Sequence, residues 1–185
     1  DQPTAATATF ASESNVSRFV PYYTFFDTSR PGEELNEEFV IFRPFVEFSR
    51  DDQRTQLQAF MIASSDPESY GQLTSYTVRP LPGESLPDGP VRVASSAEST
   101  REISRQITLD NQGDGGTSVL FGDLQAIPVA DGLIYVRPYY VSVQTGSREV
   151  SQTPEYRGVI VTYNQQSRLA DSMSSALSEL FPGFD

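Results

Sequence analysis

The 185-residue sequence contains no cysteine, no histidine, no lysine and no tryptophan. Without cysteine, the chain can form neither a disulfide framework nor a zinc–thiolate site, and it has no thiolate nucleophile. Without histidine and lysine, it lacks a Ser-His-Asp relay, imidazole ligands for a metal, Schiff-base chemistry and the phosphate-binding lysine of a P-loop. Any catalysis would have to rest on carboxylates, tyrosine or hydroxyl groups. We therefore expect a protein that is not an enzyme and that uses no cofactor and no metal.

Positive charge is also scarce, because 13 arginines face 25 acidic residues and the net charge is −12. A chain with this balance repels the phosphates of nucleic acids and of anionic lipids, so we expect no nucleic-acid partner. The longest apolar run is only Ala59–Ala63, whereas a helix needs roughly 20 apolar residues to cross a bilayer. The chain opens on Asp1 with no secretory signal pattern, and we expect it to be part of a longer protein.

The pattern of apolar residues predicts an α+β fold. Residues 1–18 are rich in Ala, Thr and Ser without apolar periodicity and are interpreted as a flexible linker, followed by a single domain over residues 19–185. Strand-type segments separated by short polar connectors predict a mostly antiparallel, curved sheet of about 7–9 strands. These segments lie near residues 19–26, 38–48, 57–64, 72–79, 118–121, 124–129, 133–143 and 158–163.

Two helices are expected, at about 97–109 and 167–181. The first is favoured by the capping-box spacing of Ser99 and Glu102 and by two isoleucines four residues apart. The second is favoured by an apolar stripe at helical spacing that ends before Pro182. The stripe consists of Leu169, Met173, Ala176, Leu177 and Leu180.

Four Arg-Pro pairs occur where a random order of 13 arginines and 13 prolines predicts about one. Proline removes a donor from the strand ladder, so strands that contain Pro44 or Pro138 must bend or lie at a border of the sheet. This architectural interpretation is favoured. The alternative is a ligand site for an anionic group or a sugar, for which the candidate residues are Arg43, Arg79, Arg137 and Tyr139.

Other polar groups have a weaker chemical interpretation. Residues 110–115 resemble the start of a calcium loop, but the twelfth position is Phe121 rather than the required glutamate, which favours a turn that ends a helix. The acidic residues near 33–38 and 51–52 are interpreted as solvated loops. Five strand tyrosines could form a platform for sugar stacking, although packing in the core is favoured. They are Tyr22, Tyr23, Tyr135, Tyr139 and Tyr140.

Several segments together resemble one bacterial family. They are PYYTFF (21–26), EEFVIFRPF (37–45), LQAFMIASSD (57–66), YGQLTSY (70–76), EISRQITLDNQG (102–113), GDLQAIPVADGLIYVRPYY (122–140) and RGVIVTYNQ (157–165). In this order and spacing they are similar to the uncharacterised protein family 0182, large bacterial integral membrane proteins of unknown function. The prolines that match Pro44 and Pro138 belong to that pattern, whereas the arginines before them do not.

The resemblance implies a location for this domain in the cell but does not imply an activity. In that family, amino-terminal membrane helices precede a large extracytoplasmic portion, and this chain resembles the last globular part of it. We therefore expect a non-catalytic interaction or scaffold domain outside the cytoplasm, in a full-length protein of the cell membrane. Its partners would be the upstream part of its own chain or envelope proteins. The alternative is a module that binds an envelope sugar, lipid or peptide through Tyr and Arg on one sheet face.

Overall fold

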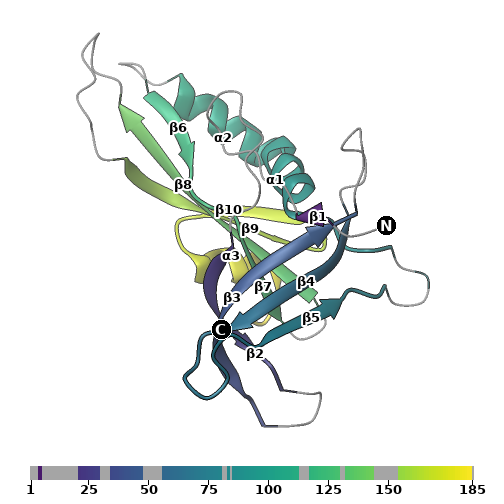
Figure 1. The fold of residues 1–185 in the computed structure, drawn as a ribbon. Coiled ribbons are helices and arrows are strands. Elements are labelled where there is room, and N and C mark those ends of the chain that lie inside the picture. Colours follow the sequence, from purple (N-terminus) through teal and green to yellow (C-terminus); the bar gives the residue numbers. More distant parts are fainter. Residues whose placement is uncertain are drawn as a thin grey trace. The chain divides into compact units, whose positions relative to one another are not determined.

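A computed structural model describes residues 4–5, 21–29, 34–47, 56–80, 83, 85–112, 117–129, 132–143 and 154–184. The chain forms two compact units, each built on one antiparallel sheet (Figure 1). Unit 1 comprises Asp1–Thr9 and Asn15–Arg92, and unit 2 comprises Phe10–Ser14 and Val93–Asp185. The expected linker at residues 1–18 lies outside the described residues except for Thr4–Ala5. A single domain over residues 19–185 stays a prediction, because two compact units can belong to one folding domain.

The sheet of unit 1 is centred on β3, which pairs with β4 along one edge and with β1 and β2 along the other. Strand β5 pairs with the far side of β4. All these pairings are antiparallel, as the short polar connectors predict. The strands are β1 (Thr4–Ala5), β2 (Tyr22–Asp27), β3 (Glu37–Val46), β4 (Leu57–Ser64) and β5 (Leu73–Thr77).

One face of this sheet carries buried apolar side chains. Val40 and Phe42 have no exposed surface, and Phe42 stacks on Phe60 with 5.2 Å between the ring centroids. Phe60 in turn stacks on Tyr76 at 4.9 Å. Cross-strand partners share a face, so the pairings Phe42↔Ile62 and Pro44↔Phe60↔Tyr76 place these residues on the same side of the sheet. This buried face anchors the four longer strands of unit 1.

The sheet of unit 2 is centred on the twelve-residue strand β8. It pairs with β9 along one edge and with both β6 and β7 along the other, while β10 pairs with β9. The pairing of Val129 with Gly132 confirms the hairpin predicted around residues 130–132. The strands are β6 (Thr117–Phe121), β7 (Gln125–Val129), β8 (Gly132–Val143), β9 (Glu155–Tyr163) and β10 (Gln166–Ala170).

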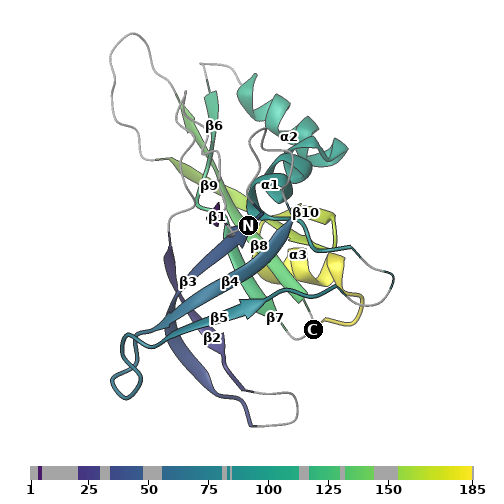
Figure 2. The same ribbon diagram turned by 45° about the vertical axis from the view of Figure 1, so that its right-hand side comes forward.

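Helices cover both faces of the unit 2 sheet (Figure 2). They are α1 (Pro90–Ser99, in unit 2 from Val93 onward), α2 (Arg101–Asn111) and α3 (Met173–Leu180). On one face, Ala97 of α1 and Ile103 of α2 pack with Ile160 of β9. On the other face, Ala176 of α3 packs with alternate residues of β8 and β9. Unit 2 is therefore a three-layer arrangement with a core on each side of the sheet.

The expected helices differ from those observed. In place of one helix at 97–109, α1 and α2 are separate, and Ser99 is the last residue of α1 rather than the cap of the next helix. The Ser99 hydroxyl donates to the carbonyl of Ser95, and α2 begins after Thr100, whose side chain makes no capping hydrogen bond. The capping-box interpretation is therefore wrong.

The expected helix at 167–181 begins only at Met173, because strand β10 occupies Gln166–Ala170 and pairs Leu169 with Ile160. Asn164 and Gln165 adopt positive φ angles of 45° and 65°, which suits the two-residue turn between β9 and β10. Asn-Gln is a weak turn signal compared with Asn-Gly, so an apolar stripe at helical spacing outweighed it in the sequence.

The single curved sheet of about 7–9 strands is also wrong, since the strands form two separate antiparallel sheets. The predicted effect of the prolines is confirmed. The strand register shifts at Phe45/Val46, just after Pro44, and at Tyr139/Tyr140, just after Pro138. In both central strands the proline lies opposite the gap between two shorter neighbours.

Pro138 shows why the gap suits proline. Its carbonyl accepts a hydrogen bond from the Gly122 backbone N–H, between β6 and β7. The nitrogen and the carbonyl of one strand residue point to the same edge, so the missing donor of Pro138 faces this gap rather than β9. The ladder between β8 and β9 therefore loses no hydrogen bond at the proline.

Candidate functional site

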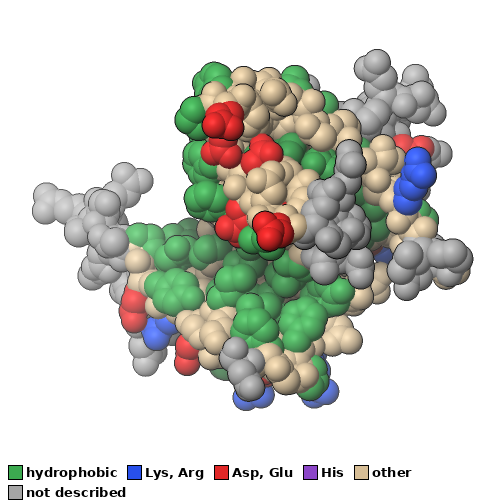
Figure 3. Space-filling view, turned by 90° about the horizontal axis from the view of Figure 1, so that it is seen from below, with side chains coloured by type: hydrophobic (Ala, Val, Ile, Leu, Met, Phe, Trp, Pro, Cys, Tyr) green, Lys and Arg blue, Asp and Glu red, His purple; other side chains and the backbone are tan. Residues whose placement is uncertain are grey.

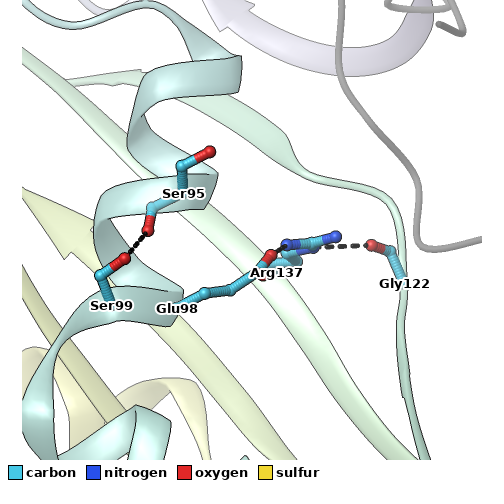
Figure 4. Close-up of polar contacts among 5 residues, drawn as sticks. All are labelled: Ser95, Glu98, Ser99, Gly122 and Arg137. Atoms are coloured by element: carbon cyan, nitrogen blue, oxygen red, sulfur yellow. Dashed lines mark hydrogen bonds and ion pairs between the residues drawn. The ribbon is translucent and has the colours of Figure 1, made fainter.

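Arg137, one of the candidate ligand-binding residues, is buried within unit 2, where its side chain contacts other residues of that unit. Its Nη1 lies 2.5 Å from Glu98 Oε1 and its Nε donates to the Gly122 carbonyl at 3.4 Å (Figure 4). Its Cζ lies 4.2 Å from the centroid of the Phe121 ring. These contacts join α1 to β8 and to the connection after β6. They give Arg137 a structural role, while its role toward a ligand stays a prediction.

Tyr139 is the second candidate residue in unit 2, and only 1% of its surface is exposed. Its hydroxyl donates to Asp110 Oδ2 at 2.6 Å, which ties β8 to the last turn of α2. Burial, together with the Asp110 carboxylate, raises the pKa of Tyr139 well above its ordinary value of 10.0. The Tyr139 hydroxyl is therefore a neutral donor, and the packing interpretation of this tyrosine holds.

The raised pKa makes Tyr139 a source of alkaline sensitivity. Its hydroxyl ionises at a higher pH in the folded chain than in the unfolded one, so its contribution to stability is complete below pH 10.0 and declines as the pH rises further. We expect Tyr139→Phe to lower the free energy of unfolding by about 1–2 kcal/mol at neutral pH and to flatten that decline. Urea unfolding between pH 7 and 11 measures both effects. Tyr70→Phe, at an exposed position, is the matched control, and an equal response in the two variants would contradict the assignment.

The segment that resembles a calcium loop begins inside α2. The Asp110 carboxylate accepts hydrogen bonds from Tyr139 and Gln106, and the Asn111 Oδ1 accepts one from the Val119 backbone. The first oxygen groups of the segment are thus engaged within the protein, in agreement with a helix end. Residues 113–116 lie outside the described part of the chain.

Arg43 and Arg79 lie in unit 1. The guanidinium of Arg43 lies over the Phe45 ring at 5.6 Å, and within the described residues its buried Nε has no hydrogen-bond partner. Arg79 is exposed after β5. Arg43 pairs with Met61, which places it on the sheet face opposite to Phe42. A ligand role for these arginines stays a prediction.

That second face of the unit 1 sheet exposes large apolar side chains. The exposed fractions are 61% for Tyr23, 66% for Phe25, 38% for Phe39 and 69% for Leu73. Tyr23 pairs across the strands with Ile41, and that row continues through Ala63 to Leu73. Phe25 pairs with Phe39 in the adjacent row. We call these six residues the aromatic face.

In the aromatic face, the Phe39 ring contacts the rings of both Tyr23 and Phe25. Tyr23 and Phe39 are nearly parallel, with centroids 5.3 Å apart and 13° between their planes, and Phe25 meets Phe39 at 5.4 Å with a tilt of 51°. Exposed apolar residues are common singly, whereas a contiguous group on one sheet face is a candidate interaction surface. In the space-filling view, hydrophobic side chains gather in contiguous groups on the surface shown, and arginines lie toward its margins (Figure 3).

Carboxylates border the aromatic face at one end. Asp27 of β2 and Glu37 of β3 are direct cross-strand partners in the row beyond Phe25 and Phe39. Hydrogen bonds from the side chain and the backbone of Ser29 hold the pKa of Asp27 below its ordinary value, so it is ionised at neutral pH. Like charges directly opposite one another destabilise a strand pair. The face therefore has an apolar centre and an anionic end.

Sequence reasoning named Tyr23 as a candidate but favoured its packing in the core, which is wrong for this exposed residue, and it missed Phe25, Phe39 and Leu73. The signal was present in Tyr22–Phe26, where large side chains occupy both the even and the odd positions of one strand. Such a strand is either buried on both faces or exposes one apolar face. The sequence alone does not distinguish these two cases, because the layer that covers each face is set by tertiary packing.

The sequence is similar to known proteins of unassigned function. The profile of the uncharacterised protein family UPF0182 matches residues 5–110. A UPF0182 protein of Cupriavidus necator is 34% identical over 179 residues, which are 97% of this chain and 18% of that protein. A relative from Pelotomaculum thermopropionicum is 34% identical over 175 residues, or 95% of this chain and 17% of the relative. No solved structure matches this chain.

These relatives are much longer than the chain described here, which spans less than one fifth of their length. No helix among the described residues is both long enough and apolar enough to cross a membrane. The match covers nearly the whole chain at an identity of about one third, and it runs through both units. The chain therefore belongs to the uncharacterised protein family UPF0182.

Proposed function

We propose that this chain is a non-catalytic interaction domain of a longer membrane protein, held outside the cytoplasm, and that it contacts other polypeptides through the aromatic face. The observation that supports this most strongly is the exposure of Tyr23, Phe25, Phe39 and Leu73 on one face of one sheet. The lack of histidine, lysine and cysteine leaves few groups for chemistry, and the family resemblance supports the location.

A polypeptide suits the aromatic face better than a sugar or a lipid does. Sugar stacking needs an open ring face, but Tyr23 and Phe39 lie nearly parallel at 5.3 Å, so each ring is partly covered by the other. Anionic lipid is opposed by the net charge of −12 and by Asp27 and Glu37 at the end of the face. Exposed aromatic side chains are enriched where proteins bind one another.

Site-specific photocrosslinking tests the proposal. The protein is produced in its native host with p-benzoylphenylalanine in place of Phe25, and in a second strain in place of Leu109, an exposed apolar residue of α2 in unit 2. We expect a discrete polypeptide adduct from position 25 and none from position 109. Equal labelling at the two positions, or no adduct at position 25, would contradict a role for the aromatic face. Protease accessibility in spheroplasts tests the extracytoplasmic location separately.

A further inference from the structure

We propose that the outer edge of β2, which pairs with no other described strand, receives an extended strand of a partner polypeptide that presents two apolar side chains and one basic side chain at alternate positions. This inference rests on the proposed function and specifies the chemistry of the partner. It combines three features of unit 1: a strand edge with no partner among the described strands, the aromatic rings beside that edge, and the carboxylates at its end.

The outer edge of β2 is open among the described strands, since β2 pairs only with β3. An edge strand directs part of its backbone N–H and C=O groups away from the sheet and so offers a template for another strand. Natural edges are commonly blocked by lysine, proline or a bulge. Within Tyr22–Asp27 there is no basic residue and no proline, and the register with β3 is continuous.

The side chains of β2 specify what an added strand would carry. Side chains on the same face of neighbouring strands lie opposite one another at a spacing of two residues. On the exposed face, β2 presents Tyr23, Phe25 and then Asp27. An added strand would therefore place apolar side chains beside Tyr23 and Phe25 and a third side chain beside Asp27.

The third side chain is expected to be basic. Asp27 and Glu37 lie directly opposite each other, and within the described residues no arginine forms an ion pair with either of them. A lysine or arginine at this position would relieve the repulsion between the two carboxylates and gain charge-assisted hydrogen bonds. Its alkyl stem would extend the apolar contact of Phe25.

Overall charge favours such a partner over a second copy of this chain. Each copy carries a net charge of −12, so self-association at an edge that ends in carboxylates is opposed by repulsion. A cationic strand would be attracted at long range by the net negative charge of the chain, and at the edge itself by the carboxylates of Asp27 and Glu37. The partner is therefore inferred to be a basic and apolar segment that adds to the sheet by strand pairing.

Binding of strand peptides to the 185-residue chain tests this inference. The probe is the peptide Thr-Val-Thr-Val-Thr-Lys-Thr, used together with its reversed order, because the direction of the added strand is open. The comparison peptides replace Lys by Glu, or the central Val by Pro. We expect one Lys peptide to bind about ten-fold more tightly than its Glu counterpart, an advantage that shrinks in high salt, and the Pro peptide not to bind. Hydrogen exchange should slow at the amides of Tyr22–Asp27.

Matched variants separate this site from general attraction to an acidic protein. Phe25→Ser is expected to weaken binding about ten-fold and Glu37→Gln about three-fold, whereas Leu109→Ser and Glu102→Gln, which alter exposed residues of α2, are expected to bind like the unmodified chain. Asp27 is left intact because its carboxylate also accepts from the Ser29 and Asn36 backbones. Failure of both Lys peptides to bind, or equal losses in all four variants, would overturn the inference. If an adduct still formed at position 25 in the crosslinking experiment, the interaction function would stand without this partner.

Discussion

Replacing Glu98 with alanine is expected to lower the free energy of unfolding by about 3 kcal/mol, one of the two largest single-residue effects we expect in unit 2. The Arg137 side chain is only 4% exposed, whereas that of Glu98 is 40% exposed. Removal of Glu98 leaves a buried guanidinium with the Gly122 carbonyl and the Phe121 ring as its remaining contacts. A buried charge that loses its partner costs far more than an exposed one that does.

The converse change is expected to cost less. Arg137→Met keeps an apolar stem of similar length against Phe121 and frees Glu98, which is exposed enough to be hydrated. In the double variant, Arg137→Met should recover part of the loss caused by Glu98→Ala. Urea unfolding of both single variants and of the double variant gives this coupling directly. Additive losses would show that the ion pair has no structural role.

Replacing Gly158 with alanine is expected to destabilise the chain by about 3 kcal/mol or more. A Cβ atom at this position of β9 would lie 2.5 Å from the carbonyl oxygen of Ala170 in β10. The obstacle is backbone that is held in the sheet, so it can move only if the β9–β10 pairing distorts. Thermal unfolding followed by circular dichroism measures the loss.

Gly132→Ala provides the control for Gly158→Ala. The added Cβ would lie 2.9 Å from a ring carbon of Tyr163, which is a side chain and can shift. We expect a clearly smaller loss, of about 1 kcal/mol. If the two glycine variants were equally stable, the close approach of β9 and β10 at Gly158 would be contradicted.

The sequence predicts the strands of this protein better than its helices. Alternating and aromatic-rich segments fix β4 and β8 to within a residue, and the short connectors fix antiparallel pairing, because both signals are local. The prolines are informative for the same reason: a missing donor restricts Pro44 and Pro138 to places where no neighbouring strand needs it. By contrast, the local pattern around Leu169 is compatible with a helix as well as with a strand. Its pairing with Ile160 of β9, which is a long-range contact, places it in a strand.

The candidate site was harder to predict from the sequence than the strands were. Arg137 and Tyr139 stand out as residue types in the sequence, yet both make buried contacts with groups 39 and 29 residues away, Glu98 and Asp110. The exposed position of Phe25 and Phe39 depends on which face of the sheet is covered, and local propensity carries no information about this. Charge pattern and strand pairing together, rather than single residues, support the proposed interaction surface.

Hydrogen exchange at β2 tests the proposed contact most directly. The exchange rates of the Tyr22–Asp27 amides are compared between the 185-residue chain alone and the protein as its native host produces it. If the aromatic face and the β2 edge are covered by a partner strand, these amides exchange at least about ten-fold more slowly in the native setting, while those of α2 change little. Equal exchange of β2 in the two settings would contradict the proposal that this edge is an interaction surface.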